Sequence, residues 1–238
     1  MNSTRKIAVI TGVVFIIATV AHLLAPLLAP VPTGADYLTG FSADRNQMAA
    51  GALLYLIGYF ACAGIAVAMY PVLKERNAVL ALGSVIFRTI ETAFYLAGLV
   101  CLLSLLTLGE RFTSAVAADR ASLQAIGDLL VSVRDHAGLL AVFAFCVGAS
   151  MYYTLFFRSR LIPRWLSGFG IVAIALLLVA CVLALFSGNR ITSYIPLAAP
   201  IFVQEMVMAV WLIAKGFNPS VSASRSATTQ TKGLVSVS

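Results

Sequence analysis

The chain has 238 residues, of which 61% are hydrophobic and only 11% are charged, and its formal net charge is +7. This composition excludes a soluble domain, because the chain has too few polar residues to cover its surface. Lipid must therefore cover most of the protein. The apolar runs are continuous over about 20 residues and do not alternate with the period of a strand, which favours membrane-spanning helices over a β-barrel.

Six apolar runs are long enough to cross a hydrocarbon core of about 30 Å. In chain order they lie near residues 7–29, 48–73, 79–108, 136–157, 165–186 and 196–214. The first run resembles a secretory signal, but it is longer than the roughly 7 to 15 residues of a signal core, so we interpret it as a helix. We therefore expect an all-α, polytopic membrane protein whose residues 1–216 form one six-helix transmembrane domain. The tail 217–238 is rich in serine and threonine, and we expect it to be disordered and cytoplasmic.

The segment between the third and fourth runs, residues 109–135, is predicted to contain an amphipathic helix on the outer side. Leu123, Ile126, Leu130 and Val133 recur at steps of three and four, and the polar residues between and beside them are Asp119, Arg120, Gln124, Asp128 and Arg134. This helix is expected to lie on the outer membrane surface or to cap the bundle. The alternative is that the segment simply extends the fourth span outward.

The distribution of lysine and arginine predicts the orientation, because basic residues resist translocation. The larger set shares one side of the predicted bundle and consists of Arg5, Lys6, Lys74, Arg76, Arg158, Arg160, Arg164, Lys215, Arg225 and Lys232. The opposite side carries Arg45, Arg111, Arg120, Arg134 and Arg190. The first side is therefore predicted to be cytoplasmic, with both termini on it. Topology explains the positive net charge, so no nucleic-acid partner is predicted.

Three charged residues fall inside the predicted spans. Arg88 and Glu91 are three residues apart on the third span, which places them on one helix face within ion-pair reach. A rise of 1.5 Å per residue puts them about 13 and 18 Å from the cytoplasmic side, and puts Glu205 about 14 Å below the outer surface. We therefore predict a polar cluster near the midplane. Its candidate hydrogen-bond partners are Gln204, Tyr55 and Tyr59.

Two carboxylates around one arginine leave a formal charge of minus one, so one glutamate is expected to hold a proton or to meet a cation. Charges at membrane depth usually mark a functional site, but a buried pair can also hold helices together. Both interpretations of the cluster remain open.

The two histidines lie toward the outer ends of their spans. His22 is in the outer third of the first span, and His136 starts the fourth. Paired imidazoles from two helices could ligate a haem iron, but no other haem feature is present, so no cofactor and no metal site is predicted. We select His136 as a proton-exchanging candidate near the outer mouth of the cluster.

Several short runs together resemble a known family. They are AMYPVLK at 68–74, FRTIE at 87–91, DHAG at 135–138, SRLIPRWL at 159–166, and WLIAKGF at 211–217 after Glu205. In these runs the chain resembles the bacterial membrane proteins grouped as domain-of-unknown-function family 4386, over nearly its whole length except the tail. The resemblance implies a six-helix protein of the bacterial inner membrane, and it implies no reaction, cofactor or substrate.

Three functions fit these features. The preferred one is a protein that binds or moves a small molecule or lipid through the midplane cluster, because midplane charge is the strongest functional signal in a membrane protein. The second is a structural or regulatory subunit of a membrane complex. The third is a membrane-embedded enzyme acting on a lipid-like substrate, but HExxH, GxSxG and P-loop signatures are all missing from the sequence. The expected partners are membrane lipids and an unidentified small molecule or membrane protein.

Overall fold

A computed structural model describes residues 3–30, 34, 37–43 and 45–218, and this part of the chain is helical throughout apart from short turns. Six helices are long and apolar enough to cross a membrane. They are α1 (Ser3–Leu28), α3 (Arg45–Leu73), α4 (Ala78–Ser114), α5 (Ala117–Ser159), α6 (Arg164–Ser187) and α7 (Ile195–Ala214). The short helix α2 (Tyr37–Ala43) precedes α3, and the 3-10 turn η1 (Ile191–Tyr194) leads into α7. The all-α expectation and its six long apolar helices are confirmed.

Local sequence explains several helix ends. The Asn77 side chain caps α4 by accepting a 3.0 Å hydrogen bond from the backbone N–H of Leu80. Gly188 follows α6 with φ +69° and Gly216 follows α7 with φ +76°, backbone conformations that a glycine adopts without steric cost. The turn between α3 and α4 is short, so these two helices are antiparallel neighbours.

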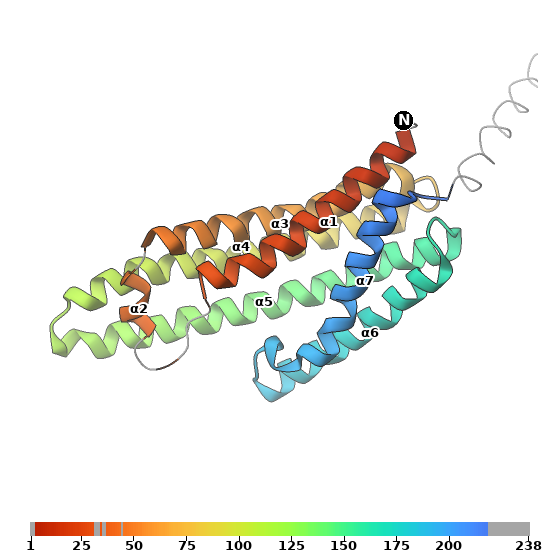
Figure 1. The fold of residues 1–238 in the computed structure, drawn as a ribbon. Coiled ribbons are helices and arrows are strands. Elements are labelled where there is room, and N and C mark those ends of the chain that lie inside the picture. The colour runs from red at the N-terminus through yellow and green to blue at the C-terminus, as the bar shows by residue number, and fades with distance from the viewer. Residues whose placement is uncertain (1–2, 31–33, 35–36, 44, 219–238) are drawn as a thin grey trace, which may run out of the picture.

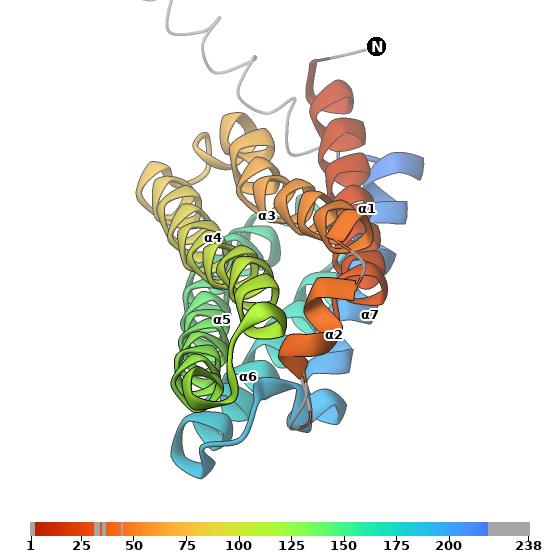
Figure 2. The ribbon, with the colours of Figure 1, turned by 90° about the vertical axis from the view of Figure 1, so that its left-hand side faces the viewer.

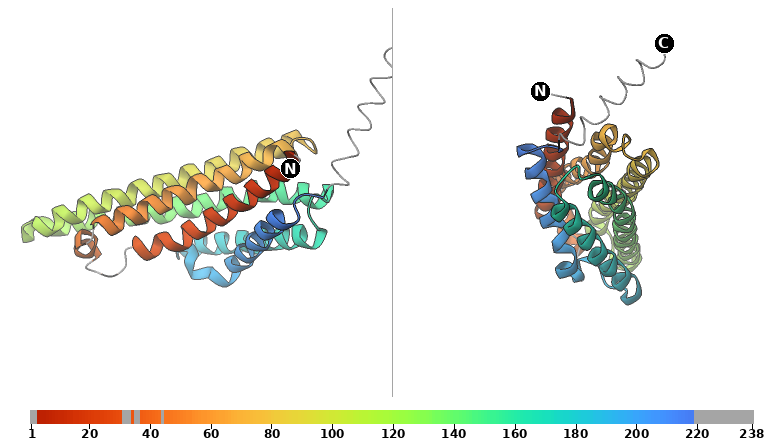
Figure 3. Two further views of the ribbon diagram at one scale, coloured as in Figure 1. Left: turned by 45° about the horizontal axis from the view of Figure 1, so that its top comes forward. Right: turned by 90° about the vertical axis from the view of Figure 1, so that its right-hand side faces the viewer.

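The six long helices form a ring in chain order. Each packs on the next, and α7 closes the ring by packing on α1 (Figure 2 and the right panel of Figure 3). The closing contact is close, because a Cβ atom on Gly12 would lie only 2.7 Å from the carbonyl oxygen of Ala209. Nearby, Arg5 Nη1 donates to the carbonyl oxygen of Leu212 at 3.0 Å. The start of α1 and the end of α7 therefore lie side by side.

The two ends of the ring differ in charge and shape. We call one the basic end, because the helix termini there carry Arg5, Lys6, Lys74, Arg76, Arg158, Arg160, Arg164 and Lys215. At the opposite end α4 and α5 project beyond the other helices as a hairpin, and we call this the hairpin end (Figure 1). These helices have 37 and 43 residues, so at 1.5 Å per residue they are about 55 and 64 Å long, well beyond a core of about 30 Å.

The prediction of a separate amphipathic helix between the third and fourth spans is wrong. Helix α5 runs without a break from Ala117 to Ser159, so its residues before 136, where the fourth span was expected to start, extend that span outward. No proline interrupts this stretch, so nothing in it stops a helix. Leu123 and Leu130 pack on the core of the hairpin, whereas Ile126 and Val133 remain exposed. The other span boundaries agree within a few residues, except that α4 continues past the predicted end at 108 to Ser114.

The two larger hydrophobic cores of the described residues lie at different heights in the ring. The core of the basic end includes the fully buried Tyr152, Tyr153 and Phe156 of α5. The core of the hairpin end centres on α4, where Leu102 and Leu105 are buried against α2 and α3. Of the predicted tail, Phe217 is buried beside Phe156 (ring centroids 6.1 Å apart), and 219–238 lie outside the described residues.

Candidate functional site

A cavity of about 340 Å³ lies inside the ring, and we call it the central cavity. Every one of the six long helices contributes to its lining. The contributions include His22 from α1, Cys62 from α3, Arg88, Glu91 and Tyr95 from α4, Phe145 from α5, Leu177 from α6, and Glu205 from α7. The ring in chain order therefore brings side chains from the whole sequence to one site.

Arg88 and Glu91 form a buried ion pair in this cavity, as their spacing predicted. Arg88 Nη1 lies 2.8 Å from Glu91 Oε2, and the two side chains are only 2% and 3% exposed. Arg88 Nε also donates to the carbonyl oxygen of Cys62 at 3.1 Å, and the guanidinium carbon lies 4.8 Å from the centre of the Phe145 ring. One arginine of α4 thus ties together α3, α4 and α5. Glu91 Oε2 has its charge partner but accepts no well-aligned hydrogen bond from the described residues.

Glu205 lines the same cavity from α7 but is not ion-paired with Arg88. Its Oε1 accepts a long hydrogen bond of 3.4 Å from the hydroxyl of Tyr152. No salt bridge among the described residues involves Glu205. The structure therefore brings the three predicted charges to one cavity but pairs only two of them.

The predicted supporting residues lie outside the lining of this cavity. Gln204 accepts a short hydrogen bond from the Tyr153 hydroxyl and donates from Nε2 to the carbonyl oxygen of Leu166 at 3.1 Å, so it fastens α7 to α5 and α6. Tyr59 stacks on Tyr95 with ring centroids 4.7 Å apart. Tyr55 stacks in turn on Tyr59 at 5.7 Å. The two tyrosines thus form an aromatic stack beside the cavity.

The histidine that lines the central cavity is His22, and not the expected His136. His22 Nδ1 lies 2.7 Å from the carbonyl oxygen of Ala18, and because a carbonyl can only accept, Nδ1 carries the proton and Nε2 is the acceptor of a neutral ring. A close approach of α1 and α3 at Gly58 provides the room, since a Cβ atom there would lie 2.8 Å from His22 Nδ1.

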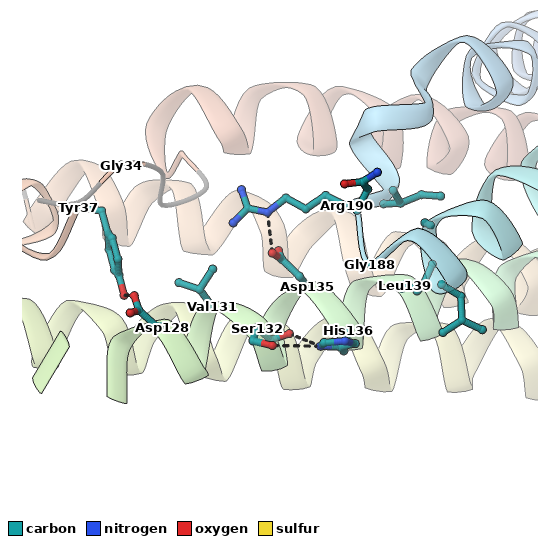
Figure 4. A pocket seen from close by; sticks show the side chains of 14 residues that line it. Gly34, Tyr37, Asp128, Val131, Ser132, Asp135, His136, Leu139, Gly188 and Arg190 are labelled. Carbon is teal, nitrogen blue, oxygen red and sulfur yellow. Dashed lines mark hydrogen bonds and ion pairs between the residues drawn. The ribbon is translucent and has the colours of Figure 1, made fainter. Parts of the chain in front are cut away.

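A larger cavity of about 560 Å³ lies at the hairpin end, and we call it the peripheral cavity (Figure 4). His136 lines it, with Nδ1 2.7 Å from the carbonyl oxygen of Ser132. The hydroxyl of Tyr37 donates to Asp128 Oδ1 at 2.9 Å, and partial burial together with this bond raises the pKa of Tyr37 above its ordinary value. His22 and His136 thus line different cavities, so they do not face one another as an axial haem pair would.

An ion pair crosses the region between the two cavities. Arg190 Nε, from the turn after α6, donates to Asp135 Oδ2 of α5 at 2.7 Å (Figure 4). Both residues line a third cavity of about 250 Å³, which shares Tyr95, Ile191 and Thr192 with the central cavity. The same Asp135, Arg190 and Ile191 also line the peripheral cavity. Polar space therefore continues from the hairpin end toward the central cavity.

The central cavity also reaches the outer surface of the bundle between α1 and α7. Leu23, Ile195 and Phe202 line it, yet they are 55%, 61% and 42% exposed. The two helices meet at the basic end and separate toward the hairpin end (Figure 1). We call this opening the lateral opening. Toward the basic end the interior of the ring is filled, because the buried aromatic side chains of α5 pack together there.

Sequence reasoning missed Tyr95 as well as His22. Arg88, Glu91 and Tyr95 stand at positions i, i+3 and i+7 of one helix, which share a face, so the helical period alone contained the signal for Tyr95. No comparable signal places Cys62 or Phe145 in the cavity.

The family model described as "Domain of unknown function (DUF4386)" matches residues 10–216. No curated protein and no solved structure matches the chain.

Proposed function

The chain belongs to the DUF4386 family, and we propose that it is a membrane protein that binds a small amphiphilic molecule in the central cavity. The observation that carries the proposal is the cavity itself, about 340 Å³ in volume and lined by all six long helices. Small-molecule sites typically have volumes of about 300 to 1,000 Å³, with mostly apolar walls and a few convergent polar groups. Here the ionisable groups include Arg88, Glu91, Glu205 and His22, among mostly aliphatic and aromatic side chains.

The lateral opening supports a ligand that is dissolved in the bilayer. Leu23 and Phe202 are large apolar side chains that face both the cavity and the surroundings of the bundle. In a membrane these surroundings are lipid, so an amphiphile could reach the cavity without crossing water. Binding is favoured over passage through the protein, because the buried Tyr152, Tyr153 and Phe156 fill the ring at the basic end.

The proposed setting is the inner membrane of a bacterium, with the basic end and both termini in the cytoplasm. Its support is the gathering of lysine and arginine at that end, since such residues resist translocation. In this orientation the hairpin of α4 and α5, with the peripheral cavity and His136, faces the outer side.

A cavity-filling variant tests the proposal. Wild-type protein would be isolated in bilayer patches cut directly from cell membranes, and its retained small molecules would be identified by mass spectrometry against the bulk lipid extract. Ala198 of α7 lines the cavity, so Ala198→Phe should exclude the ligand. Val210 is 61% exposed on the same helix, so Val210→Phe is the matched control.

We expect one molecule to be enriched on the wild-type protein and on Val210→Phe, and to be lost from Ala198→Phe. Equal retention by all three proteins would contradict binding in the central cavity. So would the absence of any enrichment over bulk lipid.

A further inference from the structure

We propose that the ligand of the central cavity is a lipophilic amine whose ammonium group binds at Glu205. This inference rests on the proposed function and adds the chemical class of the ligand. The alternatives are an anionic amphiphile, which would need a free cation in the cavity, and a neutral one, which would leave the charges of the cavity as they are.

The first argument is the charge balance of the cavity. Arg88 and Glu91 neutralise one another across 2.8 Å. Glu205 then remains with one hydroxyl at 3.4 Å and with no salt-bridge partner among the described residues. An ionised carboxylate away from water is strongly disfavoured unless it is paired with a cation or takes up a proton. A cationic ligand would supply the missing partner.

The second argument is the supply of acceptors. Glu91 Oε2 is held by Arg88 Nη1 at 2.8 Å, so the acceptors left for a ligand come from His22 and Glu205. His22 presents Nε2 as an acceptor in its neutral form, because Nδ1 donates to Ala18. Glu205 adds its two carboxylate oxygens. An ammonium group has three donors and no acceptor, so it matches a site that is rich in acceptors.

The third argument concerns Arg88, which is the cation that an anionic ligand would require. Its guanidinium is already bound to Glu91 and to the carbonyl oxygen of Cys62, and it lies against the Phe145 ring. An anionic head group would have to displace Glu91 and would bring a further negative charge toward Glu205. The arrangement therefore selects against anions.

The apolar part of the ligand follows from the walls of the cavity. Beyond the charged residues the lining is mostly aliphatic or aromatic, with the small polar side chains of Thr19, Cys62 and Thr192 among them. The lateral opening is bordered by the apolar Leu23 and Phe202. A volume of about 340 Å³ suits a body of drug-like size. The ligand is thus a single positive charge on a compact hydrophobic body.

Three probes with one body and different heads test the inference. They are 4-phenylbutylamine, 4-phenylbutanol and 4-phenylbutyrate, titrated calorimetrically into the full-length protein in lipid nanodiscs, with empty nanodiscs as the blank for partitioning. The variants are Glu205→Gln and, as a control, Glu110→Gln, whose carboxylate on α4 is exposed and paired with Arg45 of α3. Binding of the alcohol shows that a variant still has a folded cavity.

We expect the amine to bind wild-type protein about tenfold or more tightly than the alcohol, because hydrogen bonds to charged partners are the stronger ones. Glu205→Gln should lower the affinity for the amine to that for the alcohol and leave the alcohol unchanged, whereas Glu110→Gln should behave as wild type. Equal affinity for amine and alcohol, tightest binding of the carboxylate, or an unchanged amine affinity in Glu205→Gln would each overturn the amine assignment while the cavity still binds the phenylbutyl body. If none of the probes binds above the blank, the proposed function fails together with the inference.

Discussion

Removing one member of the Arg88–Glu91 pair should destabilise the protein far more than removing both. The pair is buried, with side-chain exposures of 2% and 3%, so a single replacement leaves one charge without its partner in a medium that solvates it poorly. We expect Arg88→Met to lower the free energy of unfolding by about 3 to 5 kcal/mol. The double variant Arg88→Met/Glu91→Leu should lie within about 1 or 2 kcal/mol of wild type, since it strands no charge.

The two single variants should not be equal. In Glu91→Leu the guanidinium of Arg88 can turn toward Glu205, which lines the same cavity, so part of the lost attraction is recovered. In Arg88→Met, Glu91 and Glu205 are left together without a cation from the described residues. Glu91→Leu should therefore cost less than Arg88→Met.

The assay is reversible unfolding by sodium dodecyl sulfate in mixed micelles, followed by circular dichroism, for wild type, both single variants and the double variant. Single losses below about 1 kcal/mol would mean that water solvates the pair as it does a surface ion pair. A double variant that loses as much as the two singles together would mean that the charges are not coupled. Either result would refute the reasoning.

Two further predictions test the effect of solvent exposure on an ion pair and the close approach of α1 and α3 at Gly58. Asp135→Asn breaks the 2.7 Å ion pair with Arg190, which is as short as the Arg88–Glu91 pair but whose side chains are 28% and 35% exposed. The same unfolding assay should therefore show a loss of unfolding free energy below about 1 kcal/mol. A loss as large as that of Arg88→Met would contradict this prediction. Gly58→Ala puts a methyl group 2.8 Å from His22 Nδ1 and should cost about 1 to 3 kcal/mol and weaken binding of 4-phenylbutylamine. Gly64→Ala on the same helix meets its nearest neighbour at an ordinary 3.6 Å and is the control, and equal behaviour of the two variants would refute the close approach.

The helices of this protein are largely predictable from sequence because each is a local feature. Lipid requires continuous apolar segments of a defined length, and the spacing of Arg88 and Glu91 fixes their contact within one helix. The ring is not a local feature, because its closure depends on Gly12 of α1 contacting Ala209 of α7, nearly two hundred residues later in the chain. No sequence pattern in either helix predicts this contact.

The errors have physical causes of the same kind. The periodicity of residues 123–133 predicts a helix correctly, but it cannot say whether that helix is separate or continues into the next span. The sequence gives the depth of His22 and His136 along their spans, whereas the face of the helix decides which cavity a side chain reaches. His22 turns inward where Gly58 lets α1 approach α3, a contact between two helices that depth alone does not reveal.

Photolabelling tests the central claim, binding in the central cavity, most directly and without assuming a charge on the ligand. The full-length protein in nanodiscs would be irradiated with a diazirine derivative of 4-phenylbutanol, with and without excess unlabelled 4-phenylbutanol, and the labelled residues mapped by mass spectrometry. We predict competable labelling of α1 near His22 and of α7 near Glu205, and its loss in Ala198→Phe. Labelling spread over lipid-facing residues such as Val100 and Val210, unaffected by competitor or by Ala198→Phe, would contradict the account.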